Sequence, residues 1–289
     1  MYEGWKRFLR RSRRSKEPQD TLPAAAPGLR RVAAPHAGLC AVTDFGLGRD
    51  HNEDAFYLSD GDDLIIVADG MGGHRAGEVA SELAIAATFS FLKARDGARQ
   101  DEDASRRTLV DALENAHQAV VRAALGHDEW SGMGTTFIAA RIEGDRLCTC
   151  HVGDVRCYLK TRDGLEQVTT DHSVVEEWVR RGELSREEAR VHPQRHEITQ
   201  ALGKSTRIRP EVSIRTLEPG DQVVLCSDGL TQPLDDRQLA SSMDEGGTVE
   251  DVALRLVDRA LAAGGEDNVT VVVYEYRAEG EQDSRARRS

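Results

Sequence analysis

An α+β fold is predicted, because blocks of strand-like segments alternate with blocks of helix-like segments along the chain. Two blocks of three strands each carry apolar or alternating residues between Gly/Asp turns. Two long amphipathic segments lie between these blocks, and two strands, a helix and a last strand follow them. We find no internal repeat, so one large domain with a tail is the expected organisation.

The first half of this domain is predicted to contain three strands and two helices. The strands are expected at residues 39–45, 55–59 and 64–68. The first helix, at about 78–95, is rich in Ala, Leu and Phe. The second, at about 105–125, carries one apolar face made of Leu109, Leu113, Ala116 and Val120. Both helices are therefore expected to be largely buried.

The second half begins with three strands joined by tight turns. They are predicted at residues 135–142, 146–152 and 155–160, and the turns at 143–145 and 163–164 make them antiparallel neighbours. A mostly polar helical insert is expected at about 173–189. The remaining elements are strands at 212–217 and 222–226, a helix at 249–263 and a strand at 269–276.

Both ends of the chain differ from the body in composition. Residues 1–16 carry seven Lys/Arg against the single Glu3, a net charge of +6, so a total of −12 leaves −18 for the rest. We expect residues 1–36 to be a flexible basic arm with a Pro/Ala linker, and 278–289 a disordered tail. Residues 5–16 are either a solvated tail or a weak contact for a membrane or an acidic partner. The acidic body excludes nucleic acid as an expected partner.

Nothing in the sequence directs the chain out of the cytoplasm. We find no apolar run long enough to span a bilayer and no signal peptide after the basic N-terminus. The five cysteines lie in strand-like segments, so reduced, buried thiols are expected.

Acidic residues recur where predicted strands begin or end. The apolar segments 65–70 and 223–229 both finish in Asp-Gly, as Asp69-Gly70 and Asp228-Gly229. Asp-Gly is a common turn dipeptide, so one copy would be weak evidence, but Glu53-Asp54 and Asp267 flank two further strands. If these ends converge, the carboxylates repel one another unless cations neutralise them. Oxygen ligands favour Mg²⁺ or Mn²⁺.

Two other kinds of site have weaker signals in the sequence. Cys148, Cys150 and His151 suggest zinc, but no second Cys/His pair lies at zinc-finger spacing. The glycine-rich loop at residues 70–73 suggests phosphate binding, but it lacks the Lys-Ser/Thr ending of a P-loop. Both signals are weaker than the acidic set.

Eight short motifs, in order, resemble the metal-dependent protein phosphatase 2C family in its bacterial form. The resemblance covers about residues 38–276 and is specific because the motifs occur together. The matching stretches are Thr43-Asp44-Phe45-Gly46 with Arg49-Asp50-His51-Asn52-Glu53-Asp54, Val67-Ala68-Asp69-Gly70-Met71-Gly72-Gly73-His74, Gly132-Met133-Gly134-Thr135-Thr136, His151-Val152-Gly153-Asp154, Asp171-His172-Ser173, Ala201-Leu202-Gly203, Cys226-Ser227-Asp228-Gly229-Leu230 and Glu266-Asp267-Asn268-Val269-Thr270.

The resemblance implies a fold and a set of site residues. The fold would be a sandwich of two antiparallel β-sheets flanked by pairs of helices, four αββα layers in all, with a catalytic domain at 37–277 and a helical flap at about 171–203. Two metal ions would be held by Asp69, which bridges them, by the Gly70 carbonyl, and by Asp228 and Asp267. Glu53 and Asp54 would hold metal-bound waters. Asp154, with Asp228, would bind a third ion.

The implied activity is hydrolysis of phosphoserine and phosphothreonine in proteins. A water between two Mn²⁺ or Mg²⁺ ions would attack phosphorus, and Arg49 would bind the phosphate, since a guanidinium pairs bidentately with phosphate oxygens. Arg49 and Asp69 are the residues assigned to catalysis. The expected context is a cytoplasmic, monomeric enzyme that opposes a Ser/Thr kinase. The alternatives are a catalytically weak member acting as a regulatory binding module, and an adaptor that acts through its basic arm.

The sequence departs from the family at two places. Met71 stands where many animal members have the histidine proposed as general acid, so the acid is unassigned, with His74 and a water as candidates. The usual Gly-Asp-Ser-Arg is Gly153-Asp154-Val155-Arg156, which keeps the acid but loses a hydroxyl beside the third metal site.

Overall fold

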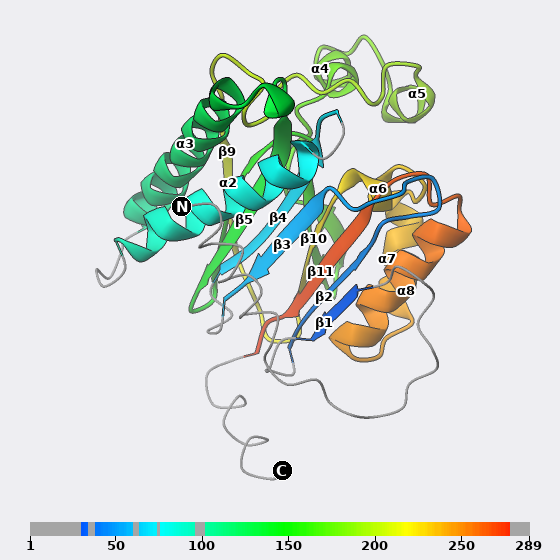
Figure 1. Cartoon of the computed structure of the whole chain (residues 1–289). Coiled ribbons are helices and arrows are strands. Elements are labelled where there is room, and N and C mark those ends of the chain that lie inside the picture. The colour runs from blue at the N-terminus through cyan, green and yellow to red at the C-terminus, as the bar shows by residue number, and fades with distance from the viewer. Residues whose placement is uncertain (1–29, 34–37, 60–63, 74–75, 96–101, 278–289) are drawn as a thin grey trace.

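Two antiparallel sheets form the centre of the protein, in a computed structural model that describes residues 30–33, 38–59, 64–73, 76–95 and 102–277 (Figure 1). The six-stranded sheet has the order β1-β2-β11-β10-β7-β8, and the five-stranded sheet has the order β3-β4-β5-β6-β9. The strands of the first sheet are β1 (Arg30–Ala33), β2 (Leu39–Asp44), β7 (Arg156–Thr161), β8 (Gly164–Gln167), β10 (Gln222–Cys226) and β11 (Val269–Glu275). Those of the second are β3 (Asp54–Leu58), β4 (Leu64–Met71), β5 (Gly134–Glu143), β6 (Arg146–Val152) and β9 (Glu211–Thr216).

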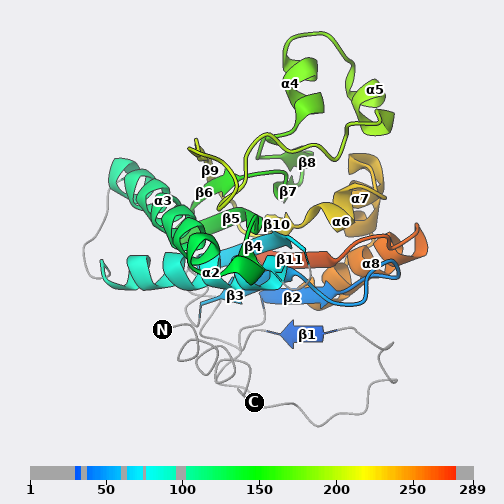
Figure 2. The same ribbon diagram turned by 45° about the horizontal axis from the view of Figure 1, so that its top comes forward.

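Helices cover the outer face of each sheet. α2 (Ala76–Lys93) and α3 (Glu102–Gly126) pack on the five-stranded sheet, and a short 3-10 helix, η1 (Asp128–Trp130), follows α3. The six-stranded sheet is covered by α6 (Asp228–Thr231), α7 (Asp236–Asp244) and α8 (Val249–Ala262). α4 (Val174–Arg180) and α5 (Arg186–Val191) stand away from the sandwich (Figure 2).

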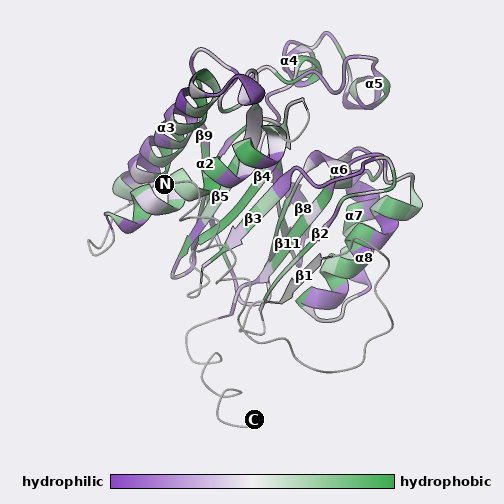
Figure 3. Ribbon diagram, viewed as in Figure 1, coloured by the Kyte–Doolittle hydropathy of each residue, from purple (hydrophilic) through white to green (hydrophobic). Residues whose placement is uncertain are grey.

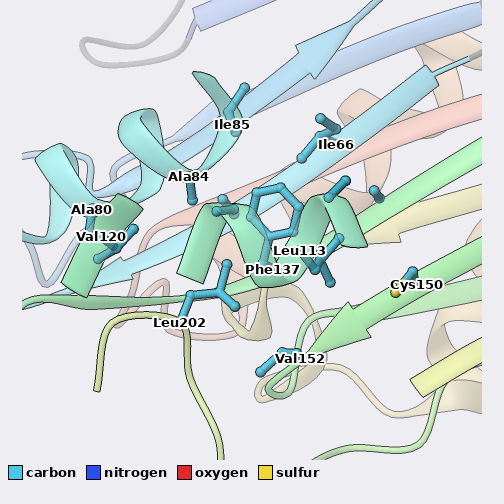
Figure 4. Close-up of a cluster of buried hydrophobic side chains, with 14 of the residues drawn as sticks. Ile66, Ala80, Ala84, Ile85, Leu113, Val120, Phe137, Cys150, Val152 and Leu202 are labelled. Carbon is cyan, nitrogen blue, oxygen red and sulfur yellow. The ribbon is translucent and has the colours of Figure 1, made fainter. Parts of the chain in front are cut away.

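The two-residue period of the strands divides the apolar side chains among three cores. On β4, Ile65 and Val67 face the core between the sheets, while Ile66 and Ala68 face α2 and α3. The central strands β4, β5, β10 and β11 are consequently apolar on both faces. By contrast, α3 and α8 show one apolar and one polar side (Figure 3). Figure 4 shows the outer core around Phe137, which is fully buried. Four layers result, αββα, as expected from the family resemblance.

Most predicted elements are present, and the differences lie in short ones. β1 pairs with β2, although its residues fall within the segment 1–36 that we expected to be arm and linker. β8, α6 and α7 were not predicted, and the single helical insert expected at 173–189 is two helices, α4 and α5. Residues 1–29 and 278–289, where the arm and the tail were expected, lie outside the described residues. Among the described helices, none is long and apolar enough to cross a bilayer.

Candidate active site

The predicted acidic residues lie at one end of the sandwich. Asp54 opens β3 and is the register partner of Asp69, near the end of β4. In the other sheet, Asp228 follows the end of β10, and Asp267 comes shortly before the start of β11, which is the antiparallel neighbour of β10. Asp154 lies between β6 and β7. Because antiparallel neighbours reverse direction, these starts and ends meet at the same edge, as the sequence predicted.

Electrostatics confirm that these carboxylates are close together. Burial raises the pKa of Asp69 well above its usual value, and the charges of Asp54, Asp228, Asp154 and Asp267 raise it further. Burial likewise raises the pKa of Asp54 to about 7, and nearby Asp228 and Asp267 add to that effect. The pKa values of Asp154 and Asp228 are also raised, first by burial and then by a neighbouring aspartate. Without a counter-charge, this end of the protein retains protons.

Asp54 and Asp228 each accept hydrogen bonds from neutral side chains through one carboxylate oxygen, Oδ2. The Oδ2 of Asp54 accepts hydrogen bonds from Ser227 Oγ and Thr270 Oγ1, both at 2.7 Å. The Oδ2 of Asp228 accepts one from Gln232 Nε2, and Asp228 shares a further hydrogen bond with Asp69. The Oδ1 atoms of Asp54 and Asp228 are buried, and within the described residues neither has a hydrogen-bond partner. A buried carboxylate oxygen without a partner is costly, and a cation would remove that cost.

Hydrogen bonds hold Glu53 between Asn268, which lies just before β11, and Gly77, at the start of α2. Its backbone N–H donates to Asn268 Oδ1 at 2.8 Å, and its carboxylate accepts from the backbone N–H of Gly77. Asn268 Nδ2 donates to the carbonyls of Phe45 and His51, both at 2.9 Å. Asn268 thus joins the loop between β2 and β3 to the loop before β11, a role we did not predict although the residue belongs to the Glu266-Asp267-Asn268 motif.

Gly70 is required at its position by close packing. A Cβ there would lie 2.2 Å from the Gly77 carbonyl and 2.6 Å from the Glu53 carbonyl, both backbone atoms that cannot move easily. A larger residue would therefore push α2 away from β4 and displace Glu53. This packing brings the backbone of Gly70 next to the acidic residues.

Arg49 lies at the rim of the site and contacts Asp267. Its Nη2 donates to Asp267 Oδ2 at 2.8 Å, and its side chain is 49% exposed. A guanidinium has five N–H donors, so the bond to Asp267 leaves donors available on the solvent side. This position is compatible with phosphate binding beside the carboxylates.

Asp154 is connected to the segment that we predicted as the flap. The Gly153 N–H donates to His172 Nδ1 at 3.1 Å, and the His172 N–H donates to the Gly153 carbonyl at 2.9 Å. Arg156, two residues after Asp154, donates three hydrogen bonds of 2.7 to 3.1 Å to the carboxylate of Asp171. Val155 packs into the core between the sheets, so the departure from the usual serine places an apolar side chain in an apolar environment.

The residues fit hard divalent cations better than zinc. The donors are carboxylates and a backbone carbonyl, which Mn²⁺ and Mg²⁺ prefer. Among the described residues, no three His, Cys, Asp or Glu side chains are arranged to hold a metal ion. Oxygens of Asp267, Asp228 and Asp54 accept hydrogen bonds from Arg49, Gln232 and Ser227 instead. The zinc candidate is disfavoured, since Cys148 and Cys150 face the α3 side of β6 while His151 stacks on His172. His74 lies outside the described residues.

A cleft of about 140 Å³ opens beside the acidic residues. Asp154, Asp228, Arg156 and Asp171 line it. The rest of the lining includes residues of α4, α5 and the loop after α5. The site is thus open to solvent next to Asp154 and Asp228.

Comparison with known proteins agrees with this geometry. The family model of protein phosphatase 2C matches residues 49–258. The chain belongs to the protein phosphatase 2C family. The serine/threonine phosphatase stp of Listeria innocua is 35% identical over 81% of this chain and 93% of its own.

Solved structures of this family have the same fold. The crystal structure of the serine/threonine phosphatase PstP of Mycobacterium tuberculosis is 37% identical, with a TM-score of 0.76 over 86% of this chain and 99% of that one. A structure of the PstP catalytic domain in complex with two manganese ions is 36% identical, with a TM-score of 0.72 over 86% and 98% of the two chains. The family assignment made from the eight sequence motifs is confirmed.

Proposed function

We propose that this protein is a metal-dependent phosphatase that hydrolyses phosphoserine and phosphothreonine in proteins. The observation that carries the proposal is the convergence of acidic residues from both sheets, with buried carboxylate oxygens that have no partner within the described residues. Family membership and the two manganese ions of PstP support it. The same convergence favours an enzyme over a regulatory binding module, since the acidic set is complete.

Each residue has a role in this proposal. Divalent ions supply positive charge that lowers the pKa of water and offsets charge on phosphoryl oxygens. Arg49 binds and orients the phosphate through the guanidinium donors that its bond to Asp267 leaves available. Asp69, the Gly70 carbonyl, Asp228 and Asp267 would hold the two ions, Glu53 and Asp54 would act through water, and Asp154 with Asp228 would hold a third ion.

The domain bounds, substrates, partner kinase and location that we propose are those that the family resemblance implies. Residues 37–277 form the catalytic domain, with the flap at about 171–203. The substrates are phosphorylated proteins, including a cognate Ser/Thr kinase and its targets, and the enzyme is a cytoplasmic monomer. The Listeria relative is named a serine/threonine phosphatase, which supports the substrate class.

Hydrolysis of an aryl phosphate tests the proposal. We expect turnover with Mn²⁺ or Mg²⁺, none with a chelator, and a loss of about a hundredfold or more in Asp228→Asn, because a neutral amide holds the ions poorly. Asp163→Asn is the matched control, since Asp163 is an exposed turn residue. Circular dichroism checks that both variants fold. Turnover that persists without metal contradicts the proposal.

A further inference from the structure

The part of the cleft lining that comes from α5 and the loop after it is basic, and we call its Arg186, Arg190 and Arg195 the wall arginines. Arg186 and Arg190 come from α5, four residues apart on one face of the helix, and Arg195 comes from the loop that follows. All three line the same cleft as Asp154 and Asp228. Arg49 lies elsewhere, beside Asp267. The protein therefore presents two separate sets of guanidinium groups around one acidic centre.

The wall arginines make few ion pairs with other described residues of the protein. Arg186 contacts Glu176 at 3.7 Å and its side chain is 71% exposed. For Arg190 and Arg195, the described residues contain no carboxylate within ion-pair distance. Arg156 lines the same cleft but differs, since its donors are engaged by Asp171 and Tyr158. Three guanidinium groups thus keep donors available to a ligand.

A purely structural role explains this arrangement poorly. Like charges four residues apart on a helix repel each other and destabilise the helix. A cation near the end of a helix recovers a similar amount, but that applies to Arg190 and not to Arg186 in the first turn. An anion bound between the side chains would offset the repulsion. The charges of this wall therefore suit an anionic ligand.

We propose that Arg186, Arg190 and Arg195 bind a second anionic group of the phosphoprotein substrate, close in sequence to the phosphoresidue that is hydrolysed. The inference rests on the proposed function. Arg49 would take the phosphate under attack, while the wall takes a neighbouring phosphate or carboxylate of the same peptide. An extended peptide advances about 3.3–3.6 Å per residue, so an anionic group one to three residues from the phosphoresidue lies about 3 to 11 Å away along the peptide. The enzyme would then prefer multiply phosphorylated or acidic sites.

Matched phosphopeptides test this preference. One phosphothreonine is kept, and a position one to three residues before or after it holds Ala, Glu or a second phosphothreonine that has been made non-hydrolysable. We compare kcat/KM for the wild type, for Arg190→Gln/Arg195→Gln, and for Arg181→Gln. Arg181 is the control because it is exposed, pairs with Glu177 and does not line the cleft. Each value is divided by the same protein's kcat/KM for an aryl phosphate.

The wild type and the control should prefer the anionic peptides at one position by about tenfold, since charge-assisted bonds to the three wall arginines are lost in the Ala peptide. In the double variant this ratio should fall towards one. Preference for Glu and phosphothreonine alike indicates a general anion site, and preference for phosphothreonine alone indicates a phosphate site. An equal ratio in wild type and double variant overturns the inference while leaving the proposed function intact. A wild type that cannot hydrolyse the aryl phosphate contradicts both.

Discussion

Among single residues, the crowding of carboxylates dominates the behaviour of the site. Asp69 has its pKa raised by burial and by four other aspartates, so the metal-free protein must keep protons there. The sequence predicted which acids meet, because Asp-Gly and Glu-Asp pairs mark strand ends. It did not predict their hydrogen bonds. The hydroxyls of Ser227 and Thr270 come from the other sheet, and that contact depends on how the sheets stack.

The metal-free protein should be more stable in mild acid than in mild base. The pKa of Asp54 is about 7 in the folded state, against 3.8 ordinarily, so between these values the folded protein binds more protons than the unfolded chain. Stability contributed by this group therefore falls as pH rises towards 7. We expect a higher Tm at about pH 5.5 than at about pH 8 in chelator, measured by thermal unfolding.

Two comparisons control this experiment. Asp54→Asn should reduce the pH dependence of Tm by the share that Asp54 contributes, since the amide does not titrate. Saturating Mn²⁺ should reverse the trend, because ions bind the deprotonated carboxylates. A Tm that rises steadily from mild acid to mild base in chelator contradicts the prediction.

For the helices and strands, success followed periodicity and length. The long helices α2, α3 and α8 and the apolar strands were predicted because their patterns extend over many residues. β8 and α6 have four residues each, too few for a pattern to emerge. α7 begins at a capping box of Asp235 and Gln238, a local signal that could have located it.

The ion pair between Arg156, at the start of β7, and Asp171, in the segment after β8, should be important for the stability of the fold. Arg156 and Asp171 are 19% and 11% exposed, so Arg156→Leu leaves a carboxylate largely buried without its partner. We expect the free energy of unfolding, measured in urea, to fall by about 3 kcal/mol in this variant. Arg215→Leu, which breaks a pair with 35% and 52% exposed side chains, should cost under about 1 kcal/mol. Equal losses in the two variants would show that burial of the pair does not matter.

At the scale of the whole molecule, β1 is the first strand of the described residues and forms one edge of the six-stranded sheet. Its four residues pair with Thr43 to Cys40 on β2, so they cover one edge of the six-stranded sheet. A chain that lacks residues 1–29 should keep its Tm, whereas one that lacks 1–36 exposes the β2 edge and should lose at least about 3 °C. Thermal unfolding and light scattering measure both effects. Identical Tm values for the two truncations refute a stabilising role for β1.

The division of the acidic residues between the two sheets has a kinetic consequence. Asp54 and Asp69 belong to one sheet, and Asp228 and Asp267 adjoin strands of the other. An ion shared by both pairs would cross-link the halves of the sandwich, so transient separation of the sheets would be the step that sets it free. The rate at which bound metal ions exchange would then measure how often the two sheets separate transiently. Slow exchange would accompany resistance to proteolysis.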